Sequence, residues 1–261
     1  MIPKVIHYCW FGGNPKSELI KRCIASWEKY CPDWEIKEWN ETSFDISSFP
    51  YTKEAYEAKK WAFVSDFVRL YVVYEHGGVY MDTDVELLQS IEELNKYCAW
   101  YAFETNLYIN TGMGFGATPK HISVKKMLEI YNERHFLKQG KPDLQPCPKG
   151  NTEGLQSSCS AFRRDGTSQN VGGVCVLSRG EYAKYAKHYG TATWGDGPVA
   201  TKKYKDTKLK RFLTKPSRID WIEKHLGKKA VDIYIFLSYD LLEMGPLFYI
   251  NRQIAKFRRK K

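Results

Sequence analysis

A long apolar segment, residues 61–75, runs into a glycine pair and then into two aspartates, and this order constrains the fold more than any other part of the chain. The segment is apolar on nearly every side, which predicts a helix buried in the interior. Gly77 and Gly78 tolerate a positive φ and predict the end of that helix. Residues 79–88 then predict a buried strand. A buried helix that leads directly into a strand is typical of an α/β protein.

Asp82 and Asp84 lie two positions apart in this predicted strand. Because side chains on a strand alternate between its two faces, we expect both carboxylates to point the same way. Two adjacent carboxylates repel each other unless a cation lies between them, and hard divalent ions prefer oxygen ligands. The pair therefore predicts a divalent metal site, with the diphosphate of a nucleotide as the other partner of the ion. Solvent-facing acids at this common spacing are the alternative.

The buried helix also carries two charged residues, Asp66 and Arg69, three positions apart. Side chains at this spacing share a helix face and can pair. Burying a charge costs several kcal/mol unless partners compensate it, so the pair is either a structural salt bridge or part of a polar site. Because the two aspartates follow closely in the chain, we expect one shared polar site.

Hydrophobic periodicity predicts alternating strands and helices along the rest of the chain. Strands are predicted at 5–11, 34–39, 79–88, 98–104 and 113–117, and helices at 16–30, 52–60, 61–75 and 121–134. This alternation argues for an α/β sheet with its ligand site beyond the carboxyl ends of the strands. Residues 139–173 are rich in Pro, Gly, Ser and Lys, which predicts a long irregular excursion whose residues receive no roles.

Positive charge is concentrated at the C-terminal end of the chain. Residues 202–261 contain 17 Lys and Arg against 6 Asp and Glu, a net charge of +11, whereas residues 1–201 contain 23 against 24. We therefore expect a near-neutral catalytic domain, 1–201, and a basic, mostly α-helical segment, 202–261. Basic residues beside an apolar stretch suit an anionic membrane surface. A helix packed on the body with a solvated tail is the alternative, and no nucleic-acid motif is recognisable.

The cysteines and the first residues of the chain indicate in which cellular compartment the protein is expected. The seven cysteines show no zinc-like spacing, which predicts free thiols in a reducing compartment, although Cys147, Cys159 and Cys175 could pair. The sequence opens on a predicted strand, without a leader pattern, and has no apolar run of membrane-spanning length. We therefore expect a cytoplasmic protein that binds peripherally to the inner face of the cell membrane.

Several motifs combine into a recognisable pattern. They are Ser65-Asp66-x-x-Arg69, Gly77-Gly78-Val79-Tyr80-x-Asp82-x-Asp84, the opening segment 2–13, Ser26-Trp27, segment 31–36 and Trp39-Asn40. Together they resemble family-32 glycosyltransferases, the capsular-polysaccharide and yeast mannosyltransferase-like enzymes, which are distantly similar to the large clostridial glucosylating toxins. The resemblance covers about residues 1–118 and returns weakly at 188–194. It implies an α/β, GT-A-type nucleotide-diphospho-sugar transferase fold with a central mixed sheet.

The resemblance implies roles for the motif residues. Asp82 would meet the donor's ribose and sugar as well as the metal ion, and Asp84 would be the direct metal ligand. Asp66 and Arg69 would hold the hydroxyls of the transferred sugar, so Asp66, Arg69 and Asp82 are the expected catalytic residues. Trp10 would stack on the uracil of the donor, for which a core tryptophan is the alternative.

Other polar residues have weaker implied roles. Asn40 would read the edge of the uracil, because an amide both donates and accepts. Asn110 lies where the family contacts the sugar or the acceptor, and both asparagines are also common turn residues. His188 would complete the metal shell and Trp194 would close over the donor, with surface positions as the alternative. His7 lies inside a predicted buried strand and is expected to be structural.

The implied reaction is metal-dependent transfer with retention of anomeric configuration, using Mn²⁺ or Mg²⁺. A hexose would move from a UDP-sugar, with galactose or N-acetylgalactosamine favoured, to a saccharide acceptor that is lipid-linked, in capsule or surface polysaccharide synthesis. No nucleic-acid partner is expected. A non-catalytic basic protein that binds membranes or nucleic acid, and a nucleotide-sugar hydrolase, are the alternative functions.

Overall fold

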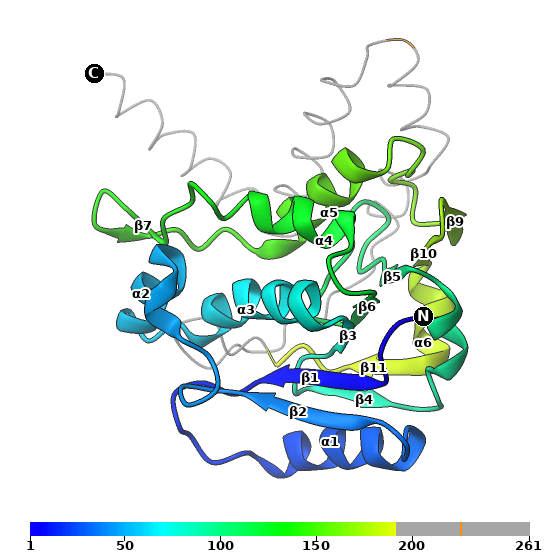
Figure 1. The fold of residues 1–261 in the computed structure, drawn as a ribbon, viewed down its shortest axis with the longest axis horizontal. Coiled ribbons are helices and arrows are strands. Elements are labelled where there is room, and N and C mark those ends of the chain that lie inside the picture. The colour runs from blue at the N-terminus through cyan, green and yellow to red at the C-terminus, as the bar shows by residue number, and fades with distance from the viewer. Residues whose placement is uncertain (192–224, 226–261) are drawn as a thin grey trace, which may run out of the picture. The chain divides into compact units, whose positions relative to one another are not determined.

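The computed structural model describes residues 1–191 and His225, and Figure 1 shows a mixed sheet with helices on both faces. Seven strands form this sheet in the order β2-β1-β3-β6-β5-β10-β9. The strands are β1 Val5–Cys9, β2 Glu35–Trp39, β3 Gly78–Tyr80, β5 Ala99–Ala102, β6 Phe115–Ala117, β9 Gln169–Val171 and β10 Val174–Leu177. The helices are α1 Glu18–Tyr30, α2 Pro50–Glu57, α3 Trp61–His76, α4 Ile122–Glu129, α5 Cys147–Ser158 and α6 Arg179–Tyr185.

The sheet mixes parallel and antiparallel pairs. Strand β1 runs parallel to β2 and β3, and β10 runs parallel to β5. Strand β6 is antiparallel to both β3 and β5, and β9 is antiparallel to β10. Two smaller sheets pair β4, Val85–Leu87, with β11, Ala186–His188, and β7, Leu137–Lys138, with β8, Lys141–Pro142. The α/β class with a mixed central sheet is therefore confirmed.

Alternation along the strands supplies a hydrophobic core on each face of the sheet. In β3 and its continuation, Tyr80 packs into one core while Val79 and Met81 pack into the other. The same period of two divides Tyr101 from Trp100 in β5. Helices α2, α3, α4 and α5 cover the first face, and α1 and α6 cover the second (Figure 1). Because strands covered on both faces are apolar throughout, they read as continuous apolar runs in the sequence.

Helix α3 forms as predicted, because its apolar residues point in every direction into the interior. Phe63, Val68 and Leu70 are among its buried side chains. The helix ends at Gly77, whose φ of 67° lies in the region that favours glycine. The chain then enters β3 at once, as expected.

The side chain of His7 connects the end of α3 to the sheet through hydrogen bonds, which confirms its predicted structural role. Its Nε2–H donates to the Gly77 carbonyl at 2.9 Å, and its Nδ1 accepts from the Trp39 indole at 3.1 Å. Both ring nitrogens are therefore satisfied by one neutral tautomer. Burial lowers the pKa of His7 to about 4.

This buried histidine makes stability depend on pH. Between pH 6.5 and about 4 the unfolded chain binds a proton at His7 that the folded chain excludes, so the free energy of unfolding should fall as the pH drops through this window. The loss should reach about 3 kcal/mol. Urea unfolding of the unmodified chain and of His7→Gln across this range would measure it. The glutamine variant should have a flatter profile, and identical slopes would contradict the assignment.

Two predicted elements differ in the structure. The predicted strand 79–88 is two strands, β3 and β4, because a turn closed by a hydrogen bond from Val85 N to Asp82 O at 3.0 Å separates them. The excursion 139–173 is not irregular throughout, since it contains the 12-residue helix α5. Glycine and small polar residues obscure the hydrophobic periodicity of α5 in the sequence. Because Gly154 has no side chain, α5 can approach the Met127 backbone of α4 closely.

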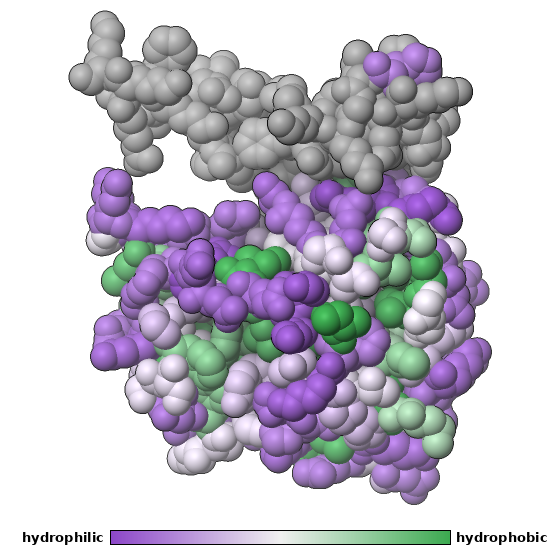
Figure 2. Space-filling model, turned by 45° about the horizontal axis from the view of Figure 1, so that its top comes forward, coloured by the Kyte–Doolittle hydropathy of each residue, from purple (hydrophilic) through white to green (hydrophobic). Residues whose placement is uncertain are grey.

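The remaining features of the fold concern thiols, surface and helix length. All seven cysteines are free, so the possible pairing of Cys147, Cys159 and Cys175 is not formed. Figure 2 shows a face on which hydrophilic residues predominate and hydrophobic ones form only small groups. Among the described helices, none is both long and apolar enough to cross a bilayer. The predicted boundary at residue 201 and the basic segment 202–261 lie outside the described residues.

Candidate active site

The turn between β3 and β4 brings together three potential metal ligands. Asp82 and Asp84 come from the turn itself, and His188 comes from β11, which pairs antiparallel with β4 so that His188 lies opposite Val85. One ligand atom from each of the three lies within 4.8 Å of the others. The aspartates thus converge as predicted, but a turn causes this rather than the two-residue period of a strand.

Asp84 is held as a carboxylate by its neighbours. Its Oδ2 accepts from the backbone and hydroxyl of Thr191 at 2.8 and 2.9 Å, and its Oδ1 lies 3.3 Å from His188 Nε2. Burial opposes its charge, but the contacts to His188 and Thr191 outweigh burial and lower the pKa of Asp84 to about 2. In return, the Asp84 carboxylate raises the pKa of His188 against the effect of burial.

This donor set fits a divalent cation. Two carboxylates and one imidazole suit Mn²⁺ or Mg²⁺, and hard cations hold oxygen ligands at roughly 2.0–2.6 Å, so ligands of one ion can be up to about 5 Å apart. The spread of 4.8 Å falls within that reach. Asp84 would be the most strongly ionised ligand of the ion. Asp82 and His188 would supply the remaining protein ligands.

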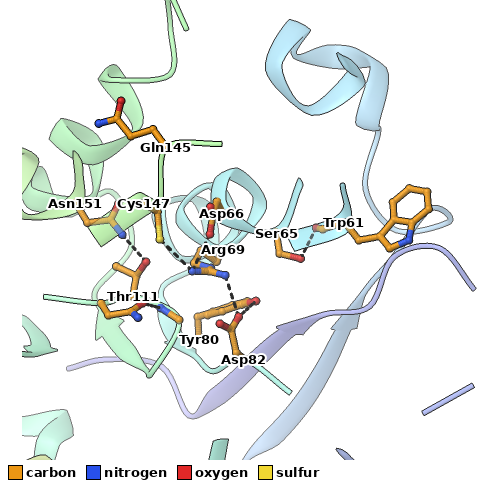
Figure 3. A network of polar contacts seen from close by, with 12 residues as sticks. Trp61, Ser65, Asp66, Arg69, Tyr80, Asp82, Thr111, Gln145, Cys147 and Asn151 are labelled. Atoms are coloured by element: carbon orange, nitrogen blue, oxygen red, sulfur yellow. Dashed lines mark hydrogen bonds and ion pairs between the residues drawn. The ribbon is translucent and has the colours of Figure 1, made fainter. Parts of the chain in front are cut away.

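Arg69 lies at the centre of a second cluster beside these ligands (Figure 3). Its Nη1 lies 3.1 Å from Asp66 Oδ1, and its Nη2 lies 2.9 Å from Asp82 Oδ1. The same Asp82 oxygen accepts from the Tyr80 hydroxyl at 2.9 Å. The guanidinium also lies over the Tyr80 ring, 5.1 Å from its centroid. The predicted pairing of Asp66 with Arg69, and their union with Asp82 in one polar site, are both confirmed.

Burial dominates the electrostatics of this cluster. It raises the pKa of Asp66 and of Asp82, although the Arg69 charge acts in the opposite direction. The two carboxylates in turn raise the pKa of Arg69 despite its burial. Arg69 Nε is buried without a hydrogen-bond partner among the described residues. The two Nη groups of Arg69 are therefore engaged by carboxylates, and its Nε–H is left unpaired in the interior of the described part of the chain.

Asn110 shapes the wall opposite Arg69. Its Oδ1 accepts from Gly112 N at 2.8 Å, and Gly112 O accepts from Asp82 N at 3.0 Å. A Cβ added to Gly112 would overlap Oδ2 of Asp82 and lie 3.1 Å from Nη1 of Arg69. The turn that was the alternative for Asn110 is therefore present, and it lies directly against the site.

Helix α5 adds site residues that the sequence did not reveal. Cys147 Sγ accepts from Arg69 Nη1 at 3.6 Å, and Asn151 Nδ2 donates to the Thr111 hydroxyl at 2.7 Å. Burial, reinforced by the Asp66 charge, raises the pKa of Cys147 well above its usual range, so this thiol stays protonated. The spacing of Cys147 and Asn151 by four residues is the only local signal, and it indicates a shared helix face without saying what that face contacts.

Two predicted donor-binding residues, Trp10 and Asn40, stand apart from this network. Trp10 is half-buried at the end of β1, with its indole donating to Asn14 O at 2.8 Å and Lys16 over its ring at 5.3 Å. The Asn40 amide is bound within its own turn, to Glu38 and Thr42 among others. Neither residue makes a hydrogen bond to Asp66, Arg69 or Asp82 in the described part of the chain. Trp194 lies outside the described residues.

Comparisons with known proteins find curated relatives of this chain. Inositol phosphoceramide mannosyltransferase 3 of Schizosaccharomyces pombe is 29% identical over 107 residues, which is 38% of this chain and 29% of that protein. Inositol phosphoceramide mannosyltransferase 1 of the same yeast is 26% identical over 147 residues, which is 52% of this chain and 46% of that protein. This chain therefore spans less than half the length of these two curated relatives.

A solved structure, the PaToxG glycosyltransferase, aligns with 60% of this chain and 69% of its own, with 19% identity and a TM-score of 0.45. Residues 17–100 match the family described as the glycosyltransferase sugar-binding region containing a DXD motif. This range includes the Asp66–Arg69 pair and both aspartates of the turn. The segment 17–100 of this chain is therefore similar to a glycosyltransferase sugar-binding region, and Asp82-Thr83-Asp84 has the form of a DXD motif.

Proposed function

We propose that this protein is a metal-dependent, retaining hexosyltransferase that uses a UDP-sugar as donor and a saccharide as acceptor. The observation that carries this proposal is the convergence of Asp82, Asp84 and His188 beside the buried pair of Asp66 and Arg69. A cation site next to a buried guanidinium and carboxylate suits a sugar attached to a diphosphate. Arg69 would donate to the sugar's hydroxyls and Asp66 would accept from them.

The contacts of Asp66 and Asp82 are relevant to the proposed retention of anomeric configuration. When bound, Mn²⁺ or Mg²⁺ would act as a Lewis acid on the diphosphate leaving group. Both carboxylates nearest to the expected sugar, Asp66 and Asp82, are held by Arg69, which leaves them poor nucleophiles. A same-face displacement through an oxocarbenium-like ion pair is therefore the proposed route to retention.

The identity of the sugar and the acceptor rests on resemblance. The family habit favours galactose or N-acetylgalactosamine. The two yeast relatives are named for mannose transfer to inositol phosphoceramide, so mannose belongs in the screen and a lipid-borne acceptor gains support. Synthesis of capsule or another surface polysaccharide would supply such an acceptor.

Thermal shift in the presence of nucleotide sugars tests the proposal. At least one UDP-hexose should raise the Tm with Mn²⁺ present, and EDTA should abolish the rise. Absence of binding to any nucleotide sugar would favour a non-catalytic basic protein instead. Release of free sugar at the same rate with and without a saccharide acceptor would show a nucleotide-sugar hydrolase.

We also propose that the enzyme works peripherally on the cytoplasmic face of the membrane. The support is the +11 charge of residues 202–261 beside apolar side chains. Each basic residue near an anionic leaflet contributes about 1 kcal/mol, so the cluster at 256–261 should bind reversibly. The full chain should float with anionic liposomes at low salt but not with neutral ones, and truncation after Pro246 should weaken this. Equal flotation of the truncated chain would refute it.

A further inference from the structure

A cleft of about 270 Å³ opens beside α5, outside the cluster of Arg69 and the metal ligands. Its lining includes Ile130, Arg134, Lys138, Gln145, Gly150 and Glu153. Pockets for drug-sized ligands usually measure roughly 300–1,000 Å³, so this cleft suits a single small ring.

The cleft and the candidate active site share the first turns of α5. Cys147 and Asn151 contact the active site, whereas Gly150 and Glu153 on the same helix line the cleft. Gln145, another lining residue, lies two positions before Cys147, and Figure 3 shows its side chain apart from the dashed contacts of the Arg69 network. A helix is about 10 Å across, so a ligand in the cleft would lie close to a sugar held at Arg69.

Arg134 presents a pre-oriented guanidinium to this cleft. It lies over the rings of Tyr51 and Tyr131, 5.2 and 5.5 Å from their centroids. Its Nη2 binds Gln145 O at 3.1 Å and Asp143 Oδ2 at 3.4 Å. Its Nε and Nη1 make no hydrogen bond within the described part of the chain. These donors are held in place at little entropic cost and remain available to a ligand.

A buried hydroxyl beneath Arg134 also lacks a partner. Tyr51 is 1% exposed, and its OH has no hydrogen-bond partner among the described residues. Burial and the charge of Asp66 raise the pKa of Tyr51. The interior next to Arg134 therefore holds one unsatisfied hydroxyl among the described residues.

The charges of the lining favour a neutral ligand over an anionic one. Arg134 and Lys138 share one carboxylate, that of Asp143, at 3.4 and 2.7 Å. Glu133 and Glu153 add two carboxylates to the lining, and Lys149 lies 3.7 Å from Glu153. The charged lining residues are therefore two cations and two anions, which gives no net attraction for a phosphate. Carboxylates, an amide and a guanidinium together both accept from and donate to hydroxyl groups. A neutral polyol is the ligand that matches this set.

We propose that this cleft binds a neutral hexose ring of an oligosaccharide acceptor, at least one unit away from the ring that receives the transferred sugar, with Arg134 as the positioning residue. The inference rests on the proposed function, because it takes the ligand at Arg69 to be the transferred sugar. The ring would receive hydrogen bonds from Arg134 and Gln145 and donate to Glu153, while Gly150 leaves the space that the ring occupies.

Filling the cleft from Gly150 tests the proposal. A Cβ at this position meets only the Ile130 side chain, at 3.6 Å, so a larger residue can extend into the cleft without a backbone clash. Gly150→Leu is the blocking variant, and Gly150→Ala is the matched control. Methyl glycosides of glucose, galactose, mannose and N-acetylglucosamine are the binding probes, followed by ligand-observed NMR. Oligosaccharides that carry the bound hexose one or two units from the accepting end are the acceptors in transfer assays.

We expect at least one methyl hexoside to bind the unmodified protein and the alanine variant. Gly150→Leu should lose this binding and raise the KM for the oligosaccharide that carries this hexose by about tenfold or more. Hydrolysis of the UDP-sugar without acceptor should be unchanged in both variants. Unchanged acceptor binding in Gly150→Leu, or no hexoside binding to the unmodified protein, would overturn the proposal. Loss of the proposed function would appear differently, as a lack of donor binding and hydrolysis in every form.

Arg134→Lys tests the positioning role, because lysine keeps the charge but loses the planar fork. It should weaken binding of the methyl hexoside, raise the KM for the oligosaccharide that carries this hexose, and leave the rate of donor hydrolysis unchanged. Inorganic phosphate should not compete with the hexoside in the unmodified protein. Competition by phosphate would show an anion site and refute a neutral ligand.

Discussion

Replacement of Asp84 by alanine is expected to lower the rate of sugar transfer by about 1,000-fold or more. Because the contacts to His188 and Thr191 lower its pKa to about 2, Asp84 is ionised at neutral pH. Its loss removes the main negative charge and also the partner of His188. Asp82→Ala should have an effect of the same order, because Asp82 joins the metal cluster to Arg69.

The measurement is transfer from the UDP-sugar that the thermal-shift screen selects, at saturating Mn²⁺, together with Mn²⁺ affinity. Circular dichroism would establish that both variants remain folded. Asp33→Ala is the matched control, since Asp33 is an exposed aspartate away from this cluster, and it should leave the rate unchanged. Near-normal turnover by folded Asp84→Ala would refute the metal-site assignment.

Replacement of Arg69 by methionine is expected to lower the free energy of unfolding by about 3–5 kcal/mol. Arg69 is 4% exposed and is the shared partner of Asp66 and Asp82. Without it, two carboxylates remain in the interior with no compensating charge. Sugar transfer should also be lost, because the proposed donor to the sugar's hydroxyls is gone.

Urea unfolding at pH 7 and at pH 5 would measure this effect. Burial already raises the pKa of both carboxyl groups, and removal of Arg69 should raise each further, so the folded state binds protons more tightly than the unfolded state. The variant should therefore be less destabilised at pH 5 than at pH 7.

Two further variants separate this loss from a general effect of removing a cation. Asp66→Asn combined with Arg69→Met should recover part of the stability without recovering transfer. The control Lys184→Met removes an exposed ion pair with Glu181 and should cost less than about 1 kcal/mol. Equal losses for the buried and exposed pairs would contradict the account.

The local features of this protein could be read from its sequence. The all-round apolar pattern of α3, the three-residue spacing of Asp66 and Arg69, and the glycine that ends the helix are properties of consecutive residues. Their physical causes, helical periodicity and the tolerance of glycine for positive φ, act within a few positions. The alternation of strands and helices that gives the α/β class has the same local origin.

Only the tertiary structure decided which distant residues complete the site. His188 reaches Asp84 because β11 pairs with β4, and no local pattern specifies that pairing. Cys147 and Asn151 enter because the backbone of α5 packs closely on α4 at Gly154. Asp82 and Asp84 converge through a hydrogen-bonded turn, although their spacing predicted a strand. Such contacts depend on packing between elements far apart in the chain, so the sequence by itself determined the carboxylates and the arginine, and the fold decided what surrounds them.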